Sequence, residues 1–283
     1  MKLSVSNIAW PERLDRKAFS LLRQRGISAL ELAPTRIWPQ WEGATATSAR
    51  RYRDHLAGEG FAVSSLQSIL FGKPACTLFS SAASREDTLE HLKLCAELAA
   101  ALGAESLVFG APGNRKRGDL PELEARAVAI DFFHSAAEIF EAHYVYLCLE
   151  ANPRQYGCDF LCASGEAATV VESVNSPGIR LHLDTACMTL SGEDMESAIR
   201  RNRAYLRHFH VSEPHLGSFS VPQVDHAAAA EALANQEYPH WVTLEMRTSE
   251  SAIDELETAV RYLAQVYQAS STEQLLEAKC TPQ

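Results

Sequence analysis

The sequence has no long hydrophobic run. None of its 283 residues falls in an apolar stretch of about 18, so we expect no membrane-spanning helix. The opening residues, MKLSVSNIAWPERL, lack the apolar segment of a signal peptide, so we expect no export signal. Apolar residues still make up 46% of the chain, which is enough for a large core.

Positive charge is also scarce. The chain has 26 Lys and Arg against 36 Asp and Glu, which gives a net charge of −10. Surfaces that bind nucleic acids usually carry a basic face, so we expect no nucleic-acid partner. A small anionic substrate is not excluded, because the local charge around a site decides that.

The cysteines lack the pattern of a disulfide framework. Their number is seven, no pair has CxxC spacing, and several lie within apolar stretches. This usage is typical of reduced thiols and favours a cytoplasmic protein.

No linker, low-complexity run or break in composition divides the chain. Short apolar segments alternate with segments of helical periodicity along its whole length. We expect strands at residues 3–8, 28–32, 61–69, 106–110, 144–150, 179–184, 206–211 and 241–246. We expect helix N-caps at Asp15, Ser84, Ser164, Ser191 and Asp225.

This alternation predicts a parallel sheet with helices outside it, in the α/β class. Eight strand–helix units favour closure into a single (β/α)8 TIM barrel over an open sheet. We expect the barrel to span residues 1–268 and a polar tail to follow at 269–283.

The fifth of these strands ends in a carboxylate. In the segment YVYLCLEANP, Glu150 follows a mostly apolar run, and Pro153 indicates that the strand stops near it. A carboxylate that ends a buried strand is costly to leave unpaired. Glu150 therefore predicts a nearby cation, metal or substrate.

Three later strands repeat this design. IRLHLDT ends in Asp184, LRHFHVSEP presents His210 and WVTLEMR carries Glu245, at successive intervals of 34, 26 and 35 residues. One strand–helix unit takes about this length, so the side chains should converge at the C-terminal mouth of the barrel. Two Glu, one Asp and one His form a set that suits a divalent metal ion.

Each of these residues alone has a simpler explanation. A carboxylate at a strand end is more often a salt-bridge partner or a helix cap, and a histidine in an apolar strand usually belongs to the core. His182 should also face the barrel interior, where we expect a core position more than a role beside a metal. The metal prediction depends on the set of residues at equivalent points of consecutive units.

The segments LCLEANPRQYG, LHLDTACM, HFHVSEPHLG and VTLEMR resemble the metal-binding strands of the sugar phosphate isomerase/epimerase superfamily. This is the group of xylose isomerase-like TIM barrels that also includes endonuclease IV, and the resemblance covers nearly the whole predicted barrel. It implies that one Mn²⁺, Mg²⁺ or Co²⁺ ion, or Zn²⁺ in their place, is bound by Glu150, Asp184, His210 and Glu245. It also implies that Glu150 and Glu245 exchange protons with the substrate.

The chemistry agrees with this role. A divalent ion chelated by a carbonyl and a neighbouring hydroxyl acidifies the C–H between them and stabilises the enediolate. Carboxylates on opposite faces of that carbon can remove and return the proton. We therefore expect a metal-dependent isomerase or epimerase of a sugar, a sugar phosphate or a related polyol.

Two alternatives stay open. A dehydratase or lyase on a polyhydroxylated substrate would use the same metal site, and a non-catalytic barrel would bind a ligand without turnover. A homo-oligomer is compatible with either. Endonuclease IV relatives build a larger metal site with extra histidines from strands 3 and 4, where this chain offers Gln67, Ser68 and Phe109.

The chain departs from the ketose 3-epimerases of this group at two positions. They have a His three residues after the strand-6 Asp, where this chain has Cys187. They have an Arg six residues after the strand-7 His, where this chain has Leu216 beside His215. Those residues clamp substrate hydroxyls in the family, so the departures argue against ordinary epimerisation of free ketoses.

Other polar residues near the predicted mouth could contact the substrate. The segment GNRKRG offers cations to a phosphate or carboxylate, although a solvated loop that balances nearby acidic residues would look the same. Of two further acidic residues, Glu31 and Glu213, we favour Glu213 because it follows His210 by three. The candidates for substrate contacts are Gln67, Asn152, Arg115, Arg117, Glu213, His215 and Cys187.

Overall fold

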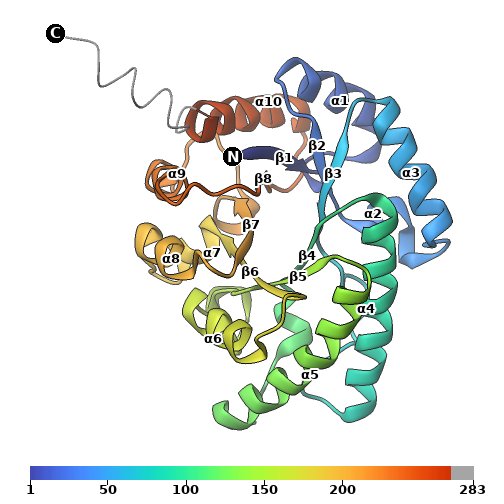
Figure 1. Cartoon of the computed structure of the whole chain (residues 1–283). Coiled ribbons are helices and arrows are strands. Elements are labelled where there is room, and N and C mark those ends of the chain that lie inside the picture. Colours follow the sequence, from blue (N-terminus) through green and yellow to red (C-terminus); the bar gives the residue numbers. More distant parts are fainter. Residues whose placement is uncertain (269–283) are drawn as a thin grey trace.

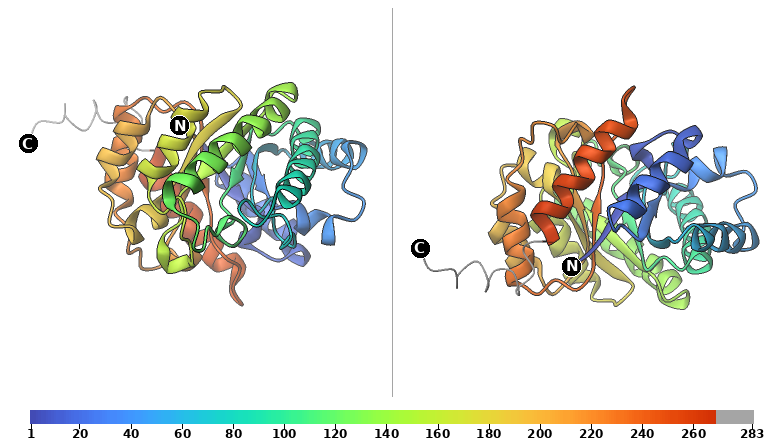
Figure 2. Two further views of the ribbon diagram at one scale, coloured as in Figure 1. Left: turned by 90° about the horizontal axis from the view of Figure 1, so that it is seen from below. Right: turned by 90° about the horizontal axis from the view of Figure 1, so that it is seen from above.

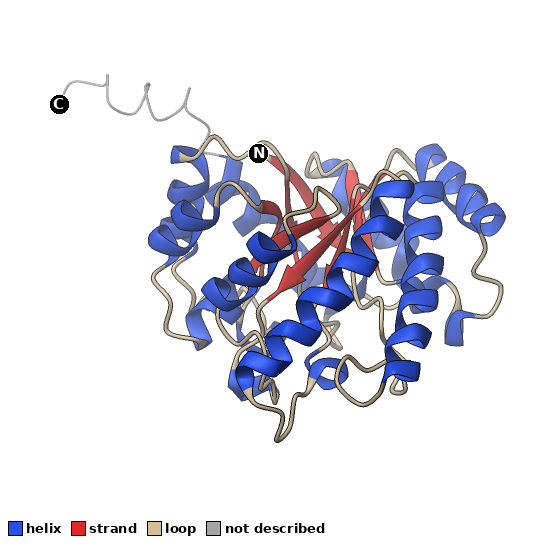
Figure 3. Ribbon diagram, turned by 60° about the horizontal axis from the view of Figure 1, so that its bottom comes forward, coloured by secondary structure: helices blue, strands red, loops and turns tan. Residues whose placement is uncertain are grey.

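The strands form a closed parallel barrel. The computed structural model describes residues 1–268, and within them eight strands pair in chain order, the last returning to the first. Figure 1 shows the strands at the centre with the helices around them, and the views in Figure 2 show the same arrangement from two further sides. Figure 3 shows the strands enclosed by the helices. The predicted (β/α)8 barrel is confirmed, whereas the predicted tail at 269–283 lies outside the described residues.

The strands agree with the predicted segments to within a few residues. They are β1 (Lys2–Ser6), β2 (Ala29–Leu32), β3 (Ala62–Leu66), β4 (Ser106–Phe109), β5 (Tyr146–Glu150), β6 (Ile179–Asp184), β7 (Leu206–Val211) and β8 (Trp241–Leu244). They are almost wholly buried, because helices cover their outer face and side chains fill the barrel on their inner face.

The helices follow the strands around the outside. They are α1 (Asp15–Gln24), α2 (Pro34–Ile37), α3 (Ala46–Gly58), α4 (Ala82–Leu102), α5 (Glu122–Ala142), α6 (Ser164–Val174), α7 (Thr185–Leu190), α8 (Met195–Asn202), α9 (His226–Asn235) and α10 (Ala252–Leu263). Short helical turns are η1 (Asn7–Ala9), η2 (Glu12–Leu14), η3 (Pro39–Trp41), η4 (Pro112–Arg115), η5 (Arg154–Tyr156), η6 (Pro214–Leu216) and η7 (Ala264–Gln268). In the described part of the chain, no helix is long and apolar enough to cross a membrane.

Of the predicted helix N-caps, Asp225 alone is correct. Asp225 caps α9 by accepting a hydrogen bond of 3.0 Å from the backbone N–H of Ala228. The prediction for α4 is wrong, because the hydroxyl of Ser81 accepts from the N–H of Ser84 and the helix begins one turn earlier. The segment SSAAS offers several serines, and a local pattern does not decide which of them is used.

The remaining predicted caps are also wrong. Asp15 and Ser164 are the first residues of α1 and α6, not their caps. Ser191 ends α7, a short helix that the periodicity did not reveal, and Asp194 caps the next helix. The Asp15 carboxylate instead accepts a hydrogen bond of 2.7 Å from the indole of Trp10.

Candidate active site

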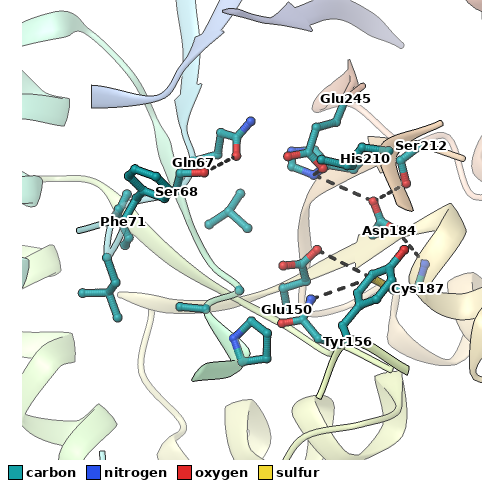
Figure 4. A pocket seen from close by; sticks show the side chains of 18 of the residues that line it. Gln67, Ser68, Phe71, Glu150, Tyr156, Asp184, Cys187, His210, Ser212 and Glu245 are labelled. Carbon is teal, nitrogen blue, oxygen red and sulfur yellow. Dashed lines mark hydrogen bonds and ion pairs between the residues drawn. The ribbon is translucent and has the colours of Figure 1, made fainter. Parts of the chain in front are cut away.

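The residues predicted as metal ligands lie at the C-terminal ends of successive strands. Glu150 and Asp184 are the last residues of β5 and β6, His210 is the penultimate residue of β7, and Glu245 directly follows β8. All of them line a cavity of about 390 Å³ at the mouth of the barrel. Figure 4 shows their functional groups gathered on one side of that cavity.

The strand register explains this convergence. Glu150 on β5 is paired with His182 on β6, and Asp184 on β6 is paired with His210 on β7. Paired residues of neighbouring parallel strands share a face, as do residues two apart on one strand. The pattern therefore adds His182 to the same inner face of the barrel.

Short distances link the polar groups of the site. His210 Nδ1 lies 3.2 Å from Glu245 Oε2 and 3.9 Å from Asp184 Oδ2. The Asp184 carboxylate also accepts hydrogen bonds of 2.6 Å from the hydroxyl of Ser212 and from the backbone N–H of Cys187. These contacts fix the position of the Asp184 carboxylate and of the groups around it.

The carboxylate of Glu31 contacts the His210 ring inside the barrel. This carboxylate is fully buried and lies 3.0 Å from His210 Nε2 and 2.9 Å from His208 Nε2. Burial alone would raise the pKa of Glu31, but His210 and His208 lower it well below its usual value by charge and hydrogen bonds. An ionised Glu31 favours a proton on Nε2 of His210, so Nδ1 is the ring nitrogen that faces Glu245 and Asp184.

Negative charge is crowded at the mouth. Burial raises the pKa of Glu150 to about 8, and the charges of Asp184 and Glu245 add to this effect while His210 opposes it. Burial also raises the pKa of Glu245. A bound cation would relieve this repulsion, because it favours the ionised form of every carboxylate around it.

The donor set fits a divalent cation. One ligand atom from each of Glu150, His182, Asp184 and His210 lies within 4.8 Å of all the others. Among the described residues, the buried His210 Nδ1 makes no hydrogen bond of good geometry and faces the carboxylates of Glu245 at 3.2 Å and Asp184 at 3.9 Å. A buried imidazole nitrogen beside several carboxylates matches the mixed oxygen and imidazole sites of divalent metals.

Three of the predicted substrate-contact residues line the cavity, namely Gln67, Asn152 and Cys187. The Asn152 amide nitrogen lies 3.7 Å from the Cys187 sulfur, which is 4.0 Å from a carboxylate oxygen of Glu150. Burial raises the pKa of the Cys187 thiol well above its usual value, and Asp184 and Glu150 add to this, so the thiol stays neutral.

Neither of the two arginines predicted to contact the substrate is among the residues that line the cavity. Arg115 is fully buried and donates to backbone carbonyls at the ends of β4 and β5 and in the loop that follows β5, including that of Glu150 at 2.7 Å. It also donates to Asn152 Oδ1 at 2.7 Å. Arg117 donates to the carbonyl oxygens of Asp159 and Leu120. These bonds hold the loops together and direct neither charge toward a substrate.

Glu213 and His215, also predicted to contact the substrate, lie outside the cavity lining. The Glu213 carboxylate is 2.9 Å from His226 Nε2 and accepts a backbone N–H at 2.9 Å. His215 donates its backbone N–H to the hydroxyl of Tyr156, and the neighbouring Leu216 lines the cavity instead. Of the two acidic residues weighed from the sequence, Glu31 is the one that reaches the site.

The opposite wall of the cavity is largely apolar. Ile69, Leu70 and Phe71 form it together with Gln67 and Ser68, and Figure 4 shows Phe71 facing the carboxylates across the cavity. Of these residues the sequence pointed only to Gln67. It placed Ser68 and Ile69 in the strand, which in fact ends at Leu66, and it made no prediction for Leu70 and Phe71 in the loop that follows.

Gly110, at the end of β4, leaves room for the Glu150 carboxylate. A methyl group at this position would overlap the Glu150 carboxylate oxygen. A glycine directly after β4 therefore allows Glu150 to keep its observed position.

Comparisons with known proteins agree with this architecture. A model of the family described as xylose isomerase-like TIM barrel matches residues 19–266. L-ribulose 3-epimerase of Mesorhizobium japonicum is 31% identical over 114 residues, which are 40% of this chain and 38% of that protein. Ketose 3-epimerase of Arthrobacter globiformis is 30% identical over 95 residues, which are 34% of this chain and 33% of that protein. The match thus covers between 33% and 38% of the length of these curated relatives.

The fold likeness extends further than the sequence likeness. A solved structure of L-ribulose 3-epimerase superposes with a TM-score of 0.79 over 100% of both chains, at 19% sequence identity. At that identity the superposition shows a shared fold alone.

Proposed function

The chain belongs to the xylose isomerase-like TIM barrel family, and from this premise we propose that it is a divalent-metal-dependent sugar isomerase or epimerase. The observation that carries the proposal is the convergence of Glu150, Asp184, His210 and Glu245 on one cavity at the barrel mouth. The matched stretches of the two 3-epimerases support a sugar as substrate.

These residues would hold one Mn²⁺, Mg²⁺ or Co²⁺ ion, because carboxylate oxygens and an imidazole nitrogen suit such ions. When bound, the ion would acidify the C–H beside a chelated carbonyl and stabilise the enediolate. Glu31 would orient His210 toward the cavity, and the hydroxyl of Ser212 would hold the Asp184 carboxylate.

Proton transfer would fall to Glu150 and Glu245. They end β5 and follow β8, so they reach the cavity from different parts of the barrel rim. One carboxylate would take a proton from the substrate carbon and the other would return it, which is general acid–base catalysis by two groups. Phe71 and the apolar wall beside it would cover the apolar C–H surface of the sugar and exclude water.

The charge of the cavity favours a neutral sugar over a sugar phosphate. Among residues 1–268, no Lys or Arg lines the cavity. The cations predicted to bind a phosphate, Arg115 and Arg117, are engaged with the chain itself. Gln67, Ser68 and Asn152 offer neutral hydrogen-bonding groups to sugar hydroxyls.

Deuterium exchange tests the proposal. The metal-loaded protein is incubated in D₂O with neutral ketoses and aldoses and, in parallel, with their phosphates. We expect deuterium at the carbon beside the carbonyl of a neutral sugar, measured by mass spectrometry. Glu150→Gln should abolish the exchange, whereas Glu213→Gln, which alters a buried carboxylate outside the cavity, should retain it. Absence of exchange with every sugar, or full exchange in Glu150→Gln, would contradict the proposal.

A further inference from the structure

His182 is a buried histidine whose imidazole nitrogens make no hydrogen bond to the described residues. Its exposed fraction is 0%, and among the described residues neither ring nitrogen has a hydrogen-bond partner. Burying an unpaired polar group costs free energy, and an aliphatic side chain would fill the barrel interior without that cost. Packing alone therefore gives no reason for a histidine at this position.

The ring of His182 lies beside the proposed metal ligands. Its Nε2 is 3.7 Å from Glu150 Oε1, and its ring centre is 4.2 Å from that of His210. Strand register sets this position, because His182 is paired with Glu150 on β5 and lies two residues before Asp184, which is itself paired with His210 on β7.

The spacing suits ligands of one ion. One ligand atom each from Glu150, His182, Asp184 and His210 lies within 4.8 Å of the others. Ligands on opposite sides of an octahedral ion, each about 2.1 Å from it, are about 4.2 Å apart. The unpaired nitrogens of His182 are thus close enough to share an ion with these residues.

We propose that His182 is a further ligand of the metal ion at the barrel mouth, and that it shifts the preference of the site toward Zn²⁺ and Co²⁺. This inference rests on the proposed function, since it concerns the same ion. A second imidazole makes the donor set richer in nitrogen, which suits Zn²⁺ and Co²⁺, whereas Mg²⁺ and Mn²⁺ suit oxygen donors.

The test compares metal binding in variants without using turnover. His182→Leu removes the nitrogens and keeps an apolar side chain of similar size, and His182→Gln keeps a polar one. The matched control is His226→Gln, a buried histidine 2.9 Å from Glu213 that belongs to neither group of possible metal ligands among the described residues. Each metal-free protein is titrated calorimetrically with Zn²⁺ and with Mn²⁺, and its thermal unfolding is recorded with and without Zn²⁺.

We expect His182→Leu to bind Zn²⁺ at least about tenfold more weakly, since loss of a group that only supports a ligand costs 10–100-fold. The Mn²⁺ affinity should fall less, so the Zn²⁺/Mn²⁺ affinity ratio drops. The Tm of the metal-free variant should equal or exceed that of the wild type, because the unpaired nitrogens are gone. A purely structural histidine would instead give a lower Tm and an unchanged affinity ratio.

The outcomes separate this inference from the proposed function. A wild type that binds metal and exchanges deuterium, together with an unchanged affinity ratio in both His182 variants, overturns the role of His182 alone. A wild type that binds neither Zn²⁺ nor Mn²⁺ overturns both the role of His182 and the proposed function. If His182→Leu does not fold, the same ratio measured on His182→Gln decides the question.

Discussion

Replacing Glu31 by Gln tests how the barrel interior prepares His210 for a metal. The carboxylate of Glu31 accepts from two rings, at 2.9 Å from His208 Nε2 and 3.0 Å from His210 Nε2. Both rings bond Glu31 Oε2, and Oε1 also lies 3.0 Å from His210 Nε2. Glutamine has nearly the same shape but carries an NH₂ group in place of one of these oxygens, so either orientation of the amide sets a donor against the N–H of His210. The variant thus removes the fixed orientation of His210 without opening a cavity.

The expected effect of Glu31→Gln on metal affinity and on stability follows from the hydrogen bonds of Glu31 to the two histidines. A hydrogen bond to a charged group contributes about 1.5–3 kcal/mol, and loss of a group that orients a ligand weakens metal binding 10–100-fold. We therefore expect the Kd for Mn²⁺ to rise by about 10–100-fold in Glu31→Gln, which corresponds to about 1.4–2.7 kcal/mol. The free energy of unfolding of the metal-free protein should also fall by about 1–3 kcal/mol.

Calorimetric titration with Mn²⁺ and urea unfolding measure these two quantities. Glu213→Gln is the matched control, because Glu213 is also buried and lies 2.9 Å from a histidine, His226, away from the cavity. The control should lose stability to a similar degree and keep its Mn²⁺ affinity. Equal Mn²⁺ affinity in Glu31→Gln and wild type would refute the reasoning, as would an equal loss of affinity in the control.

Further predictions concern residues outside the ligand set. Gly110→Ala should weaken Mn²⁺ binding by about tenfold or more, because the new methyl group displaces the Glu150 carboxylate. Its far-ultraviolet circular dichroism spectrum should stay the same, and an unchanged Mn²⁺ affinity would contradict the assignment of Glu150 as a ligand. Burial, together with the charge of Arg207, lowers the pKa of His240 from 6.5 to about 4 in the folded protein. As the pH falls from 6.5 to 4, His240 is therefore protonated in the unfolded chain before it is protonated in the folded one, and the free energy of unfolding falls. Over that pH range His240→Gln should lose about 1 kcal/mol less free energy of unfolding than the wild type, since solvent screening reduces the full effect. Urea unfolding at several pH values measures this, and the same pH dependence in both proteins would contradict it. Arg115→Met should lower the free energy of unfolding by at least about 3 kcal/mol, because several buried acceptors lose their donor; a small loss in the same assay would refute the assignment.

The barrel could be predicted because each unit carries its own local signal. β6 and β7 begin and end at the predicted residues, since apolar runs and the loops that bound them mark both limits. The convergence at the mouth followed from one rule, that parallel strands of a closed barrel end together. The predicted ligands needed only to occupy the ends of consecutive strands.

Contacts across the barrel left no local signal. Glu31 is 177 residues from His208 and 179 from His210 in the sequence, and only closure of the barrel brings β2 and β7 together inside it. Proximity to His210 along the chain favoured Glu213, which the structure places with His226 instead. The alternation of His208 and His210 on β7 was a usable sign, because residues two apart on a strand share a face.

Loop positions were the other source of error. Arg115 looked like a free cation in the segment GNRKRG, yet η4 folds back and buries it against the backbone of two loops. A charged residue in a sequence does not reveal whether its side chain is buried or what it contacts. In the structure, backbone carbonyl groups accept hydrogen bonds from Arg115 and Arg117, which were expected to bind a substrate.

Metal stoichiometry tests the central claim most directly. The protein is saturated with Mn²⁺, passed through a desalting column and analysed by inductively coupled plasma mass spectrometry beside Asp184→Asn. Asp184 lies 3.9 Å from His210 Nδ1 and accepts two hydrogen bonds that an asparagine oxygen can partly retain, so the variant should fold. We predict about one ion per chain in the wild type and nearly none in the variant. A wild type without metal, or equal metal in both proteins, would contradict the assignment of the barrel mouth as a metal site.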